Sequence, residues 1–132
     1  MWNTKRVGAL LVALVLAAAF PAGAAGSPQD RTYVKNCRGA LPTLPIGSTL
    51  GTEGDDVMVG TGGDDVIYGN GGDDLICGRD GKDTIYGGAG EDYLAGNDGH
   101  DHLYGGPGRD TLAGNGGCDH LYGGNGNDLL LP

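Results

Sequence analysis

Hydrophobic residues recur at an interval of nine through the second part of the chain. From residue 51 to residue 131 the sequence divides into nine consecutive nine-residue units without an insertion. A large aliphatic residue occupies the eighth position of every unit: Met58, Ile67, Ile76, Ile85, Leu94, Leu103, Leu112, Leu121 and Leu130. Positions seven to nine are rich in β-branched and aromatic residues, which favour strands, and side chains alternate between the two faces of a strand. The pattern therefore predicts nine short strands that each bury position eight.

Glycine separates these strands at two fixed positions, the first and the fourth of every unit. Glycine accepts positive φ values at no steric cost, and Asn, which is frequent between the glycines, also tolerates them. The turn glycines are Gly51, Gly54, Gly60, Gly63, Gly69, Gly72, Gly78, Gly81, Gly87, Gly90, Gly96, Gly99, Gly105, Gly108, Gly114, Gly117, Gly123 and Gly126. A chain that alternates a six-residue turn with a three-residue strand at constant period is predicted to coil into a solenoid.

Aspartate occupies the sixth position of every unit, where the turn ends: Asp56, Asp65, Asp74, Asp83, Asp92, Asp101, Asp110, Asp119 and Asp128. The repeats hold sixteen acidic residues against three basic ones. Two carboxylates stacked about 5 Å apart repel by roughly 3 kcal/mol at an effective dielectric constant of about 20. A divalent cation would remove this repulsion. Calcium suits such turns because it accepts carboxylate and main-chain carbonyl oxygens in a tolerant geometry, whereas magnesium should substitute poorly.

These units resemble the RTX, or haemolysin-type, calcium-binding nonapeptide repeat, G-G-x-G-x-D-x-U-x with U a large aliphatic residue. Six of the nine copies replace the second glycine by Thr, Asn or Arg. The resemblance implies an all-β fold, a right-handed parallel β-roll in which one coil takes two repeats and Ca²⁺ lies between turns one coil apart. About seven internal sites follow, each with two of the aspartates: Asp56 with Asp74, Asp65 with Asp83, Asp74 with Asp92, Asp83 with Asp101, Asp92 with Asp110, Asp101 with Asp119, and Asp110 with Asp128.

Position nine supports the same two-repeat coil. Tyrosine occurs there in every second unit, at Tyr68, Tyr86, Tyr104 and Tyr122. Such alternation predicts one tyrosine column on an outer face of the roll, which either packs across the sheet or binds a sugar or a protein partner. Position five instead varies among Asp, Glu, Lys, His, Arg, Cys and Asn. A required ligand would not vary in this way, so we interpret position five as solvated charge.

The composition and charge of the chain indicate that its folding depends on calcium. The chain of 132 residues contains 29 Gly and 6 Pro and carries a formal net charge of −9. This acidity argues against binding to nucleic acid or to an anionic membrane. The scarcity of large aliphatic residues argues against a globular enzyme with one large core, and in a charged chain it favours disorder. We therefore expect the repeats to be largely unfolded without calcium.

The N-terminal residues have the three parts of a secretory signal peptide. Lys5 and Arg6 precede the apolar run 7–20, and the small residues 22–24 supply a cleavage pattern. The run is shorter than the roughly 20 apolar residues that a membrane span requires. We expect residues 1–24 to be removed and the remaining protein to be secreted into an extracellular, oxidising and calcium-containing medium, with no membrane span.

Residues 25–50 are interpreted as an N-terminal cap or linker before the nine repeats. The three cysteines are Cys37, Cys77 and Cys118. Cys77 and Cys118 would lie about two and a half coils, or roughly 12 Å, apart along the roll, beyond the reach of a disulfide. Our hypothesis is a disulfide between Cys37 and Cys77 that staples residues 25–50 over the first coils. Cys118 would then be a free or intermolecular thiol.

No catalytic constellation stands out in the sequence. The only serines after the leader, Ser27 and Ser48, lie outside the repeats. His102 and His120 occupy position seven one coil apart and could chelate a transition metal, although ordinary surface residues explain them as well. The leading hypothesis is a secreted calcium-binding protein, not an enzyme, whose roll folds or rigidifies on binding Ca²⁺. The alternative is a calcium-dependent adhesin or matrix module that uses the tyrosine face or the open edge at 129–131, including self-association.

Overall fold

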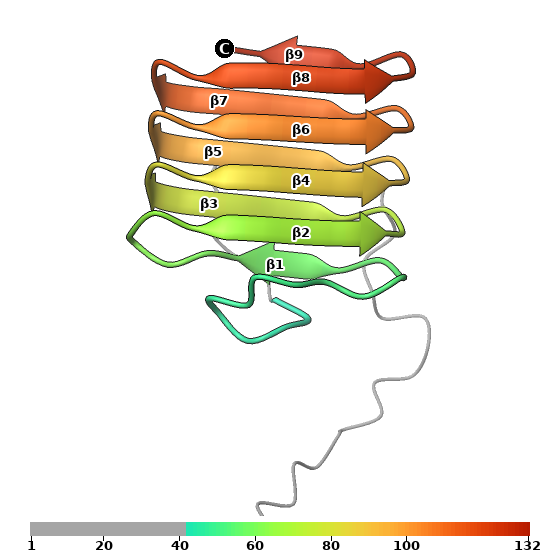
Figure 1. Ribbon diagram of the computed structural model, residues 1–132, viewed down its shortest axis with the longest axis horizontal. Coiled ribbons are helices and arrows are strands. Elements are labelled where there is room, and N and C mark those ends of the chain that lie inside the picture. The colour runs from blue at the N-terminus through green and yellow to red at the C-terminus, as the bar shows by residue number, and fades with distance from the viewer. Residues whose placement is uncertain (1–41) are drawn as a thin grey trace, which may run out of the picture.

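A computed structural model describes residues 42–132, and this part of the chain is built from strands without a helix, so it holds no helix able to cross a membrane (Figure 1). The strands are β1 (Val57–Val59), β2 (Val66–Gly71), β3 (Leu75–Gly81), β4 (Thr84–Ala89), β5 (Tyr93–Gly99), β6 (His102–Pro107), β7 (Thr111–Gly117), β8 (His120–Asn125) and β9 (Leu129–Leu131). One strand falls at the end of each nonapeptide, which confirms the expected all-β architecture.

Consecutive strands belong to opposite sheets. The five-stranded sheet has the order β1-β3-β5-β7-β9 and the four-stranded sheet the order β2-β4-β6-β8 (Figure 1). All neighbours are parallel, and each residue pairs with the residue 18 positions later, as Met58 with Ile76 and Ile85 with Leu103. The chain is therefore a parallel β-solenoid in which one coil takes two units, as the tyrosine alternation predicts.

Most strands are longer than the predicted three residues. Strands β2 to β8 have six or seven residues because they continue into the following turn, where for example Asn70 pairs with Gly88. Successive turns of the same edge have the same length, so the 18-residue register holds in the turns as well as in the strands. The turn backbone can consequently join the parallel ladder.

Position eight fills the interior between the two sheets. Seven of its side chains have no exposed surface and form one continuous cluster: Met58, Ile67, Ile76, Ile85, Leu94, Leu103 and Leu112. Leu121 is half-buried against this cluster, and Leu130 is 45 % exposed. The last two members are less buried because no coil of the described chain stacks beyond them.

Residues 42–50 cover the first coil. Leu44 packs against the interior cluster. The main-chain N–H groups of Thr43 and Gly47 donate to the carbonyl oxygens of Val57 and Val59, at 3.0 and 2.8 Å. These contacts agree with a cap at this end, although the cap as a domain stays a prediction. The expected leader 1–24 and residues 25–41 lie outside the described residues.

Candidate functional site

The position-six aspartates lie where each turn passes into its strand. Six of the nine are buried, and Asp83 has no exposed surface. The other three, Asp65, Asp119 and Asp128, are half-buried. A carboxylate taken out of water is costly unless a partner stabilises its charge. The arrangement of the oxygens around these side chains therefore determines what the turns can bind.

Aspartates one coil apart are joined by hydrogen bonds in all seven of the expected pairs. In each pair the main-chain N–H of the earlier residue donates to Oδ1 of the later one, at 2.8 to 3.0 Å. Asp83, for example, donates to Asp101 Oδ1 and accepts at its own Oδ1 from Asp65. The structure thus brings together every pair that the resemblance implies, and the Oδ1 of the later aspartate in each pair accepts a hydrogen bond.

The second carboxylate oxygen has no such partner in the middle of the roll. Among residues 42–132, five buried Oδ2 atoms accept no hydrogen bond: those of Asp74, Asp83, Asp92, Asp101 and Asp110. A buried oxygen of a charged group that lacks a donor is unfavourable. A bound cation would compensate for the missing donors.

In the first turn on each edge, a threonine donates hydrogen bonds to this second carboxylate oxygen, Oδ2. Thr52 donates to Asp56 Oδ2 from its main-chain N–H and its hydroxyl, at 2.7 and 2.9 Å. Thr61 bonds Asp65 Oδ2 in the same way, at 2.7 and 3.0 Å. Thr43 adds a hydroxyl bond of 3.1 Å to Asp56 Oδ1. The repeat pattern does not reveal these roles, although Thr stands at position two in the first two units alone.

The position-one glycines allow these Oδ2 atoms to lie close to the backbone. A Cβ atom added at Gly69 would overlap both Asp74 Oδ2 and the main-chain carbonyl oxygen of Gly87, which lies one coil later. A Cβ at Gly105 would likewise overlap Asp110 Oδ2 and a carbonyl oxygen of the next coil. At these two positions a carboxylate oxygen and a carbonyl oxygen therefore converge on the glycine, and only a residue without a Cβ atom permits this approach.

Burial changes the acidity of these aspartates. It raises the pKa of Asp74 to about 7, and those of Asp83 and Asp92 to about 6. Loss of solvation is the main cause, a main-chain hydrogen bond opposes it, and neighbouring carboxylates add to it. The pKa values of Asp101 and Asp110 are raised for the same reasons. Each of these groups would be stabilised as an anion by a nearby positive charge.

The donor set is poor in side chains and rich in main-chain oxygens. In residues 42–132 no three His, Cys, Asp or Glu side chains gather in a way that could hold a metal ion. Zinc and similar ions usually require three or four such side chains, whereas calcium also accepts main-chain carbonyl oxygens. Paired aspartates beside glycine carbonyls therefore fit calcium, and these turns are the candidate site.

The acidic side chains Asp55, Asp64 and Asp73 at position five are exposed, as the interpretation of solvated charge expects, and they also form hydrogen bonds between coils that the sequence pattern does not show. Asp55 Oδ1 accepts from the N–H of Asp73, and Asp73 Oδ1 accepts from the N–H of Glu91, at 2.9 and 2.8 Å. On the other edge Asp64 Oδ1 accepts from the N–H of Lys82 at 2.9 Å. These side chains are exposed but connect the turns of successive coils. The varied residue types at position five hid this shared role.

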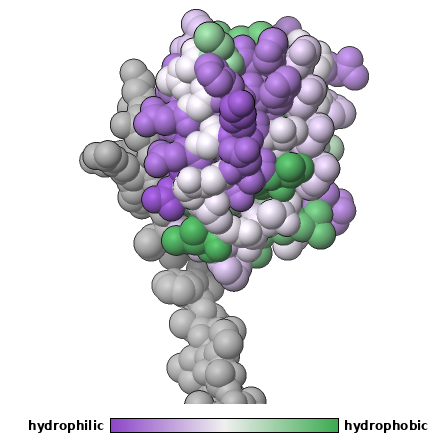
Figure 2. All heavy atoms as spheres, turned by 60° about the vertical axis from the view of Figure 1, so that its left-hand side comes forward, coloured by the Kyte–Doolittle hydropathy of each residue, from purple (hydrophilic) through white to green (hydrophobic). Residues whose placement is uncertain are grey.

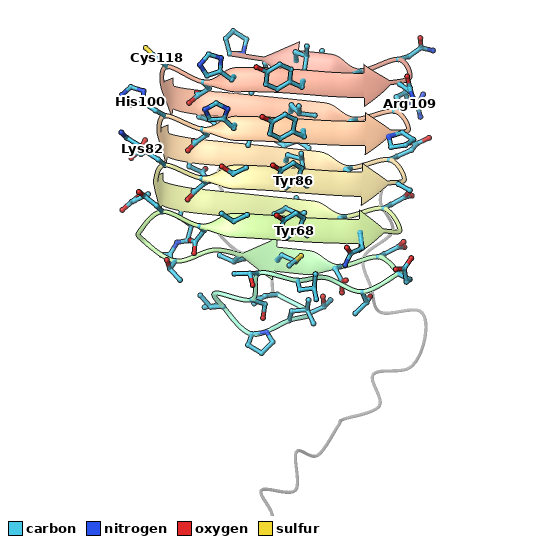
Figure 3. All side chains as sticks on the ribbon, in the orientation of Figure 1. Tyr68, Lys82, Tyr86, His100, Arg109 and Cys118 are labelled. Atoms are coloured by element: carbon cyan, nitrogen blue, oxygen red, sulfur yellow. The ribbon has the colours of Figure 1, made fainter. Side chains whose placement is uncertain are left out.

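The position-five residues line the two edges of the roll. Lys82, His100 and Cys118 follow one another along the edge that precedes the four-stranded sheet, and Arg109 lies on the other edge (Figure 3). Arg109 forms an exposed ion pair of 3.0 Å with Glu91, its neighbour one coil earlier. The edge that comes forward in Figure 2 carries rows of hydrophilic side chains. The surface of the turns is therefore polar, while their aspartates are buried beneath it.

The cysteines differ in state. Cys77 is disulfide-bonded and has no exposed surface, whereas Cys118 is free and exposed. Cys37, the predicted partner of Cys77, lies outside the described residues. The pairing of Cys37 with Cys77 thus stays a prediction.

Two ladders of rings cross the four-stranded sheet. The tyrosines of position nine stack with ring centroids 4.8 to 4.9 Å apart (Figure 3). His102 and His120 stack at 4.7 Å. The expected tyrosine column is therefore present, and packing between its rings explains it. No side chain beyond the two histidines completes a metal site within residues 42–132.

Comparison with known proteins gave one match. A family model described as RTX calcium-binding nonapeptide repeat (4 copies) matches residues 50–85, 78–103 and 95–130. These ranges join into one segment that holds all the turns described above. Neither a curated protein nor a solved structure matches the chain.

Proposed function

Because the chain belongs to the family of RTX calcium-binding nonapeptide repeats, we propose that the stacked turns bind Ca²⁺ through the nine position-six aspartates. The observation that carries this proposal is the set of five buried Oδ2 atoms without a donor. In each of these turns Oδ2 lies against the position-one glycine, where a Cβ atom would overlap it. The unsatisfied charge of these oxygens, together with the carbonyl oxygens that approach Gly69, Gly87 and Gly105, therefore supports a cation there.

The aspartates and the glycines have separate tasks in this proposal. Oδ1 holds the register, because it accepts the N–H of the preceding coil. In the five central aspartates Oδ2 is the oxygen that remains for the ion, together with carbonyl oxygens of the neighbouring turns. Calcium, when bound, supplies the positive charge that offsets the repulsion between stacked carboxylates. The seven aspartate pairs give about seven internal sites.

We place this protein outside the cell, where calcium is plentiful, and assign it an ion-binding rather than a catalytic role. The roll folds or becomes rigid when calcium binds, since the stacked buried carboxylates oppose folding without a cation. Extracellular calcium modules bind with dissociation constants on the order of 10⁻⁴ to 10⁻³ M. An affinity in that range would keep the protein unfolded during synthesis and folded after export.

The test compares two aspartates of one turn. Asp83 is a proposed ligand at position six, while Asp80 lies exposed at position three of the same unit. The Asp83→Asn and Asp80→Asn variants lose the same charge, and the Asn carbonyl oxygen can still accept from Asp65. Asp83→Asn should weaken calcium binding by about tenfold or more, the equivalent of about 1.4 kcal/mol, since a ligand to a charged group is lost. Asp80→Asn should leave the affinity almost unchanged.

Isothermal titration calorimetry with calcium measures both affinities. Equal losses in the two variants would show that net charge alone attracts the ion, and this would overturn the assignment of Asp83. The same titration with magnesium should give much weaker binding, because magnesium retains its waters and requires strict octahedral geometry.

The adhesin alternative stays a second proposal, supported by the exposure of its surfaces. Tyr68 and Tyr122 are 43 and 50 % exposed, and Leu129, Leu130 and Leu131 are exposed on β9. Sedimentation in calcium would test self-association, and a glycan array would test sugar binding. A monomer at all concentrations that binds no glycan would exclude this alternative.

A further inference from the structure

The two turns that flank β1 hold their position-six aspartates differently from the turns that follow (Figure 1). Asp56 Oδ2 accepts two hydrogen bonds from Thr52, one from the main-chain N–H and one from the hydroxyl, and Asp65 Oδ2 accepts the same two from Thr61. Each threonine hydroxyl in turn accepts from the N–H at position four, at 3.2 and 3.3 Å. The five orphaned Oδ2 atoms farther along the roll receive no hydrogen bond. Each row of aspartates therefore begins with an Oδ2 that already has its partners.

The backbone of these two turns also differs at position two. From the third unit on, the residue at this position has a positive φ, as Asn70 and Gly88 have at 81° and 119°. Thr52 and Thr61 are not among the residues with a positive φ. A β-branched residue rarely adopts that conformation, and the N–H of each threonine points instead at the aspartate of its own turn. The residue at position two thus selects between a turn that gives Oδ2 two donors and a turn that gives it none.

The carboxylate of the first turn also lies farther from the position-one glycine. A Cβ atom built at Gly51 would stand 3.2 Å from Asp56 Oδ2, whereas one built at Gly69 would overlap Asp74 Oδ2. The same contrast holds on the other edge between the first turn and the next. In the first turns Oδ2 is therefore held by the threonine and not against the glycine.

The orphaned oxygens match the aspartate pairs that exclude these two turns. Of the seven hydrogen-bonded pairs, two begin with Asp56 or Asp65, whose Oδ2 atoms have threonine donors. Each of the other five pairs begins with one of the five aspartates whose Oδ2 is orphaned. These pairs are Asp74 with Asp92, Asp83 with Asp101, Asp92 with Asp110, Asp101 with Asp119, and Asp110 with Asp128.

Resting on the proposed function, which gives each of the seven pairs one ion, we propose that Thr52 and Thr61 close the first pair on each edge to calcium, so that the chain binds five ions. A carboxylate oxygen has about two lone-pair sites, and the two donors of each threonine use both. The hydrogens of these donors carry partial positive charge, which opposes a cation at the same oxygen. Thr43 adds a further donor to Asp56, at Oδ1. The first aspartate of each row is thus stabilised without an ion.

The number of calcium ions bound by the unmodified chain tests this proposal first. Equilibrium dialysis against rising calcium, followed by atomic emission analysis, gives the number of ions per chain at saturation. We expect five, one for each orphaned oxygen. Six or seven ions would overturn the closure by threonine, and fewer than five would overturn the match between ions and orphaned oxygens. A chain that binds no calcium would contradict the proposed function itself, so the two failures are distinguishable.

A matched pair of double variants tests the threonines directly. Thr52→Gly combined with Thr61→Gly removes both hydroxyls and introduces the residue found at Gly88, Gly106 and Gly124, which all have a positive φ at position two. This variant should bind seven ions, two more than the unmodified chain. Thr52→Ser combined with Thr61→Ser keeps the hydroxyls and should still bind five. Five ions in the glycine variant, or seven in the serine variant, would overturn the proposal.

Single replacements serve if the double glycine variant does not fold, which circular dichroism in saturating calcium establishes. Thr52→Gly and Thr61→Gly each act on one edge of the roll, so each single variant should bind six ions. A folded single variant that still binds five ions would overturn the role of its threonine.

Discussion

At the scale of single residues, position two of the repeat shows how the coil constrains its sequence. From the third unit on, this position has a positive φ in every copy, whether it is occupied by Gly, by Asn or by Arg79. Asn70, Asn97 and Asn115 have φ values of 81°, 78° and 72°, and Arg79 has 95°. Residues other than Gly and Asn adopt a positive φ at a cost of about 1 to 2 kcal/mol. The relaxation of the second glycine is therefore limited to residues that tolerate this conformation, with one exception.

Arg79 is that exception, and its replacement should stabilise the roll. Arg79→Asn should raise the free energy of unfolding by about 1 kcal/mol relative to Arg79→Gln, because Asn tolerates the left-handed region better than Gln does. Both variants lose the same positive charge, so calcium binding and charge repulsion are matched. Chemical denaturation in calcium measures the difference, and equal stability of the two variants would contradict the strain at position 79.

At the scale of elements, the turns are as regular as the strands. The turns hold a hydrogen-bonded row through position six inside the roll, and several of them are also joined through position five on its surface. The outer row is continuous from Asp55 through Asp73 to Glu91. The turns of one edge are consequently joined by hydrogen bonds from coil to coil, as the strands of each sheet are.

The outer row should contribute measurably to stability. Asp73→Ala removes the acceptor of the Glu91 N–H and should lower the free energy of unfolding by about 1 kcal/mol. Asp73→Asn keeps an acceptor oxygen and should lose less than half of that amount. Thermal unfolding in calcium, followed by circular dichroism, compares the two variants. If Ala and Asn have the same effect, the loss comes from charge and not from the hydrogen bond.

The sequence predicts the elements well because each repeated position has one dominant physical cause. Position eight is apolar because it fills the interior. Position one is Gly because a Cβ would meet a carboxylate or a backbone atom, and from Gly72 on position four is Gly because a Cβ would meet the backbone of the preceding coil. The period therefore shows the strands and the two-unit coil. The bonds at position five could not be predicted, since the carboxylates of Asp55 and Asp64 and the imidazole of His100 all accept main-chain N–H groups there. The threonines Thr52 and Thr61 were missed because they act only in the first turn of each edge.

At the scale of the whole molecule, the buried carboxylates form two rows, one along each edge of the roll. The raised pKa values mean that these groups hold protons more tightly in the folded chain than in the unfolded chain. A raised pKa in the folded state stabilises the fold fully below the unfolded pKa, and this stabilisation disappears as the pH rises through the folded value. For Asp74 that loss centres near pH 7, and for Asp83 and Asp92 near pH 6.

Protons should therefore replace calcium in part. In chelator, the folded fraction of the chain should be larger at about pH 5 than at about pH 8, as measured by the β-sheet signal in circular dichroism. In calcium the trend should reverse, because protons compete with the ion and the apparent affinity falls below about pH 7. A roll in chelator that becomes less stable on acidification from pH 8 to pH 5 would contradict the burial of these aspartates as unpaired groups.

The central claim is that calcium turns an acidic, glycine-rich chain into an ordered roll. The most direct measurement is a calcium titration of the chelator-treated protein at neutral pH, followed by far-ultraviolet circular dichroism. We predict a largely unfolded spectrum in chelator that changes to a β-sheet spectrum as calcium rises into the range of about 10⁻⁴ to 10⁻³ M. A chain that keeps its β-sheet spectrum in chelator, or that shows no change at millimolar calcium, would contradict the account.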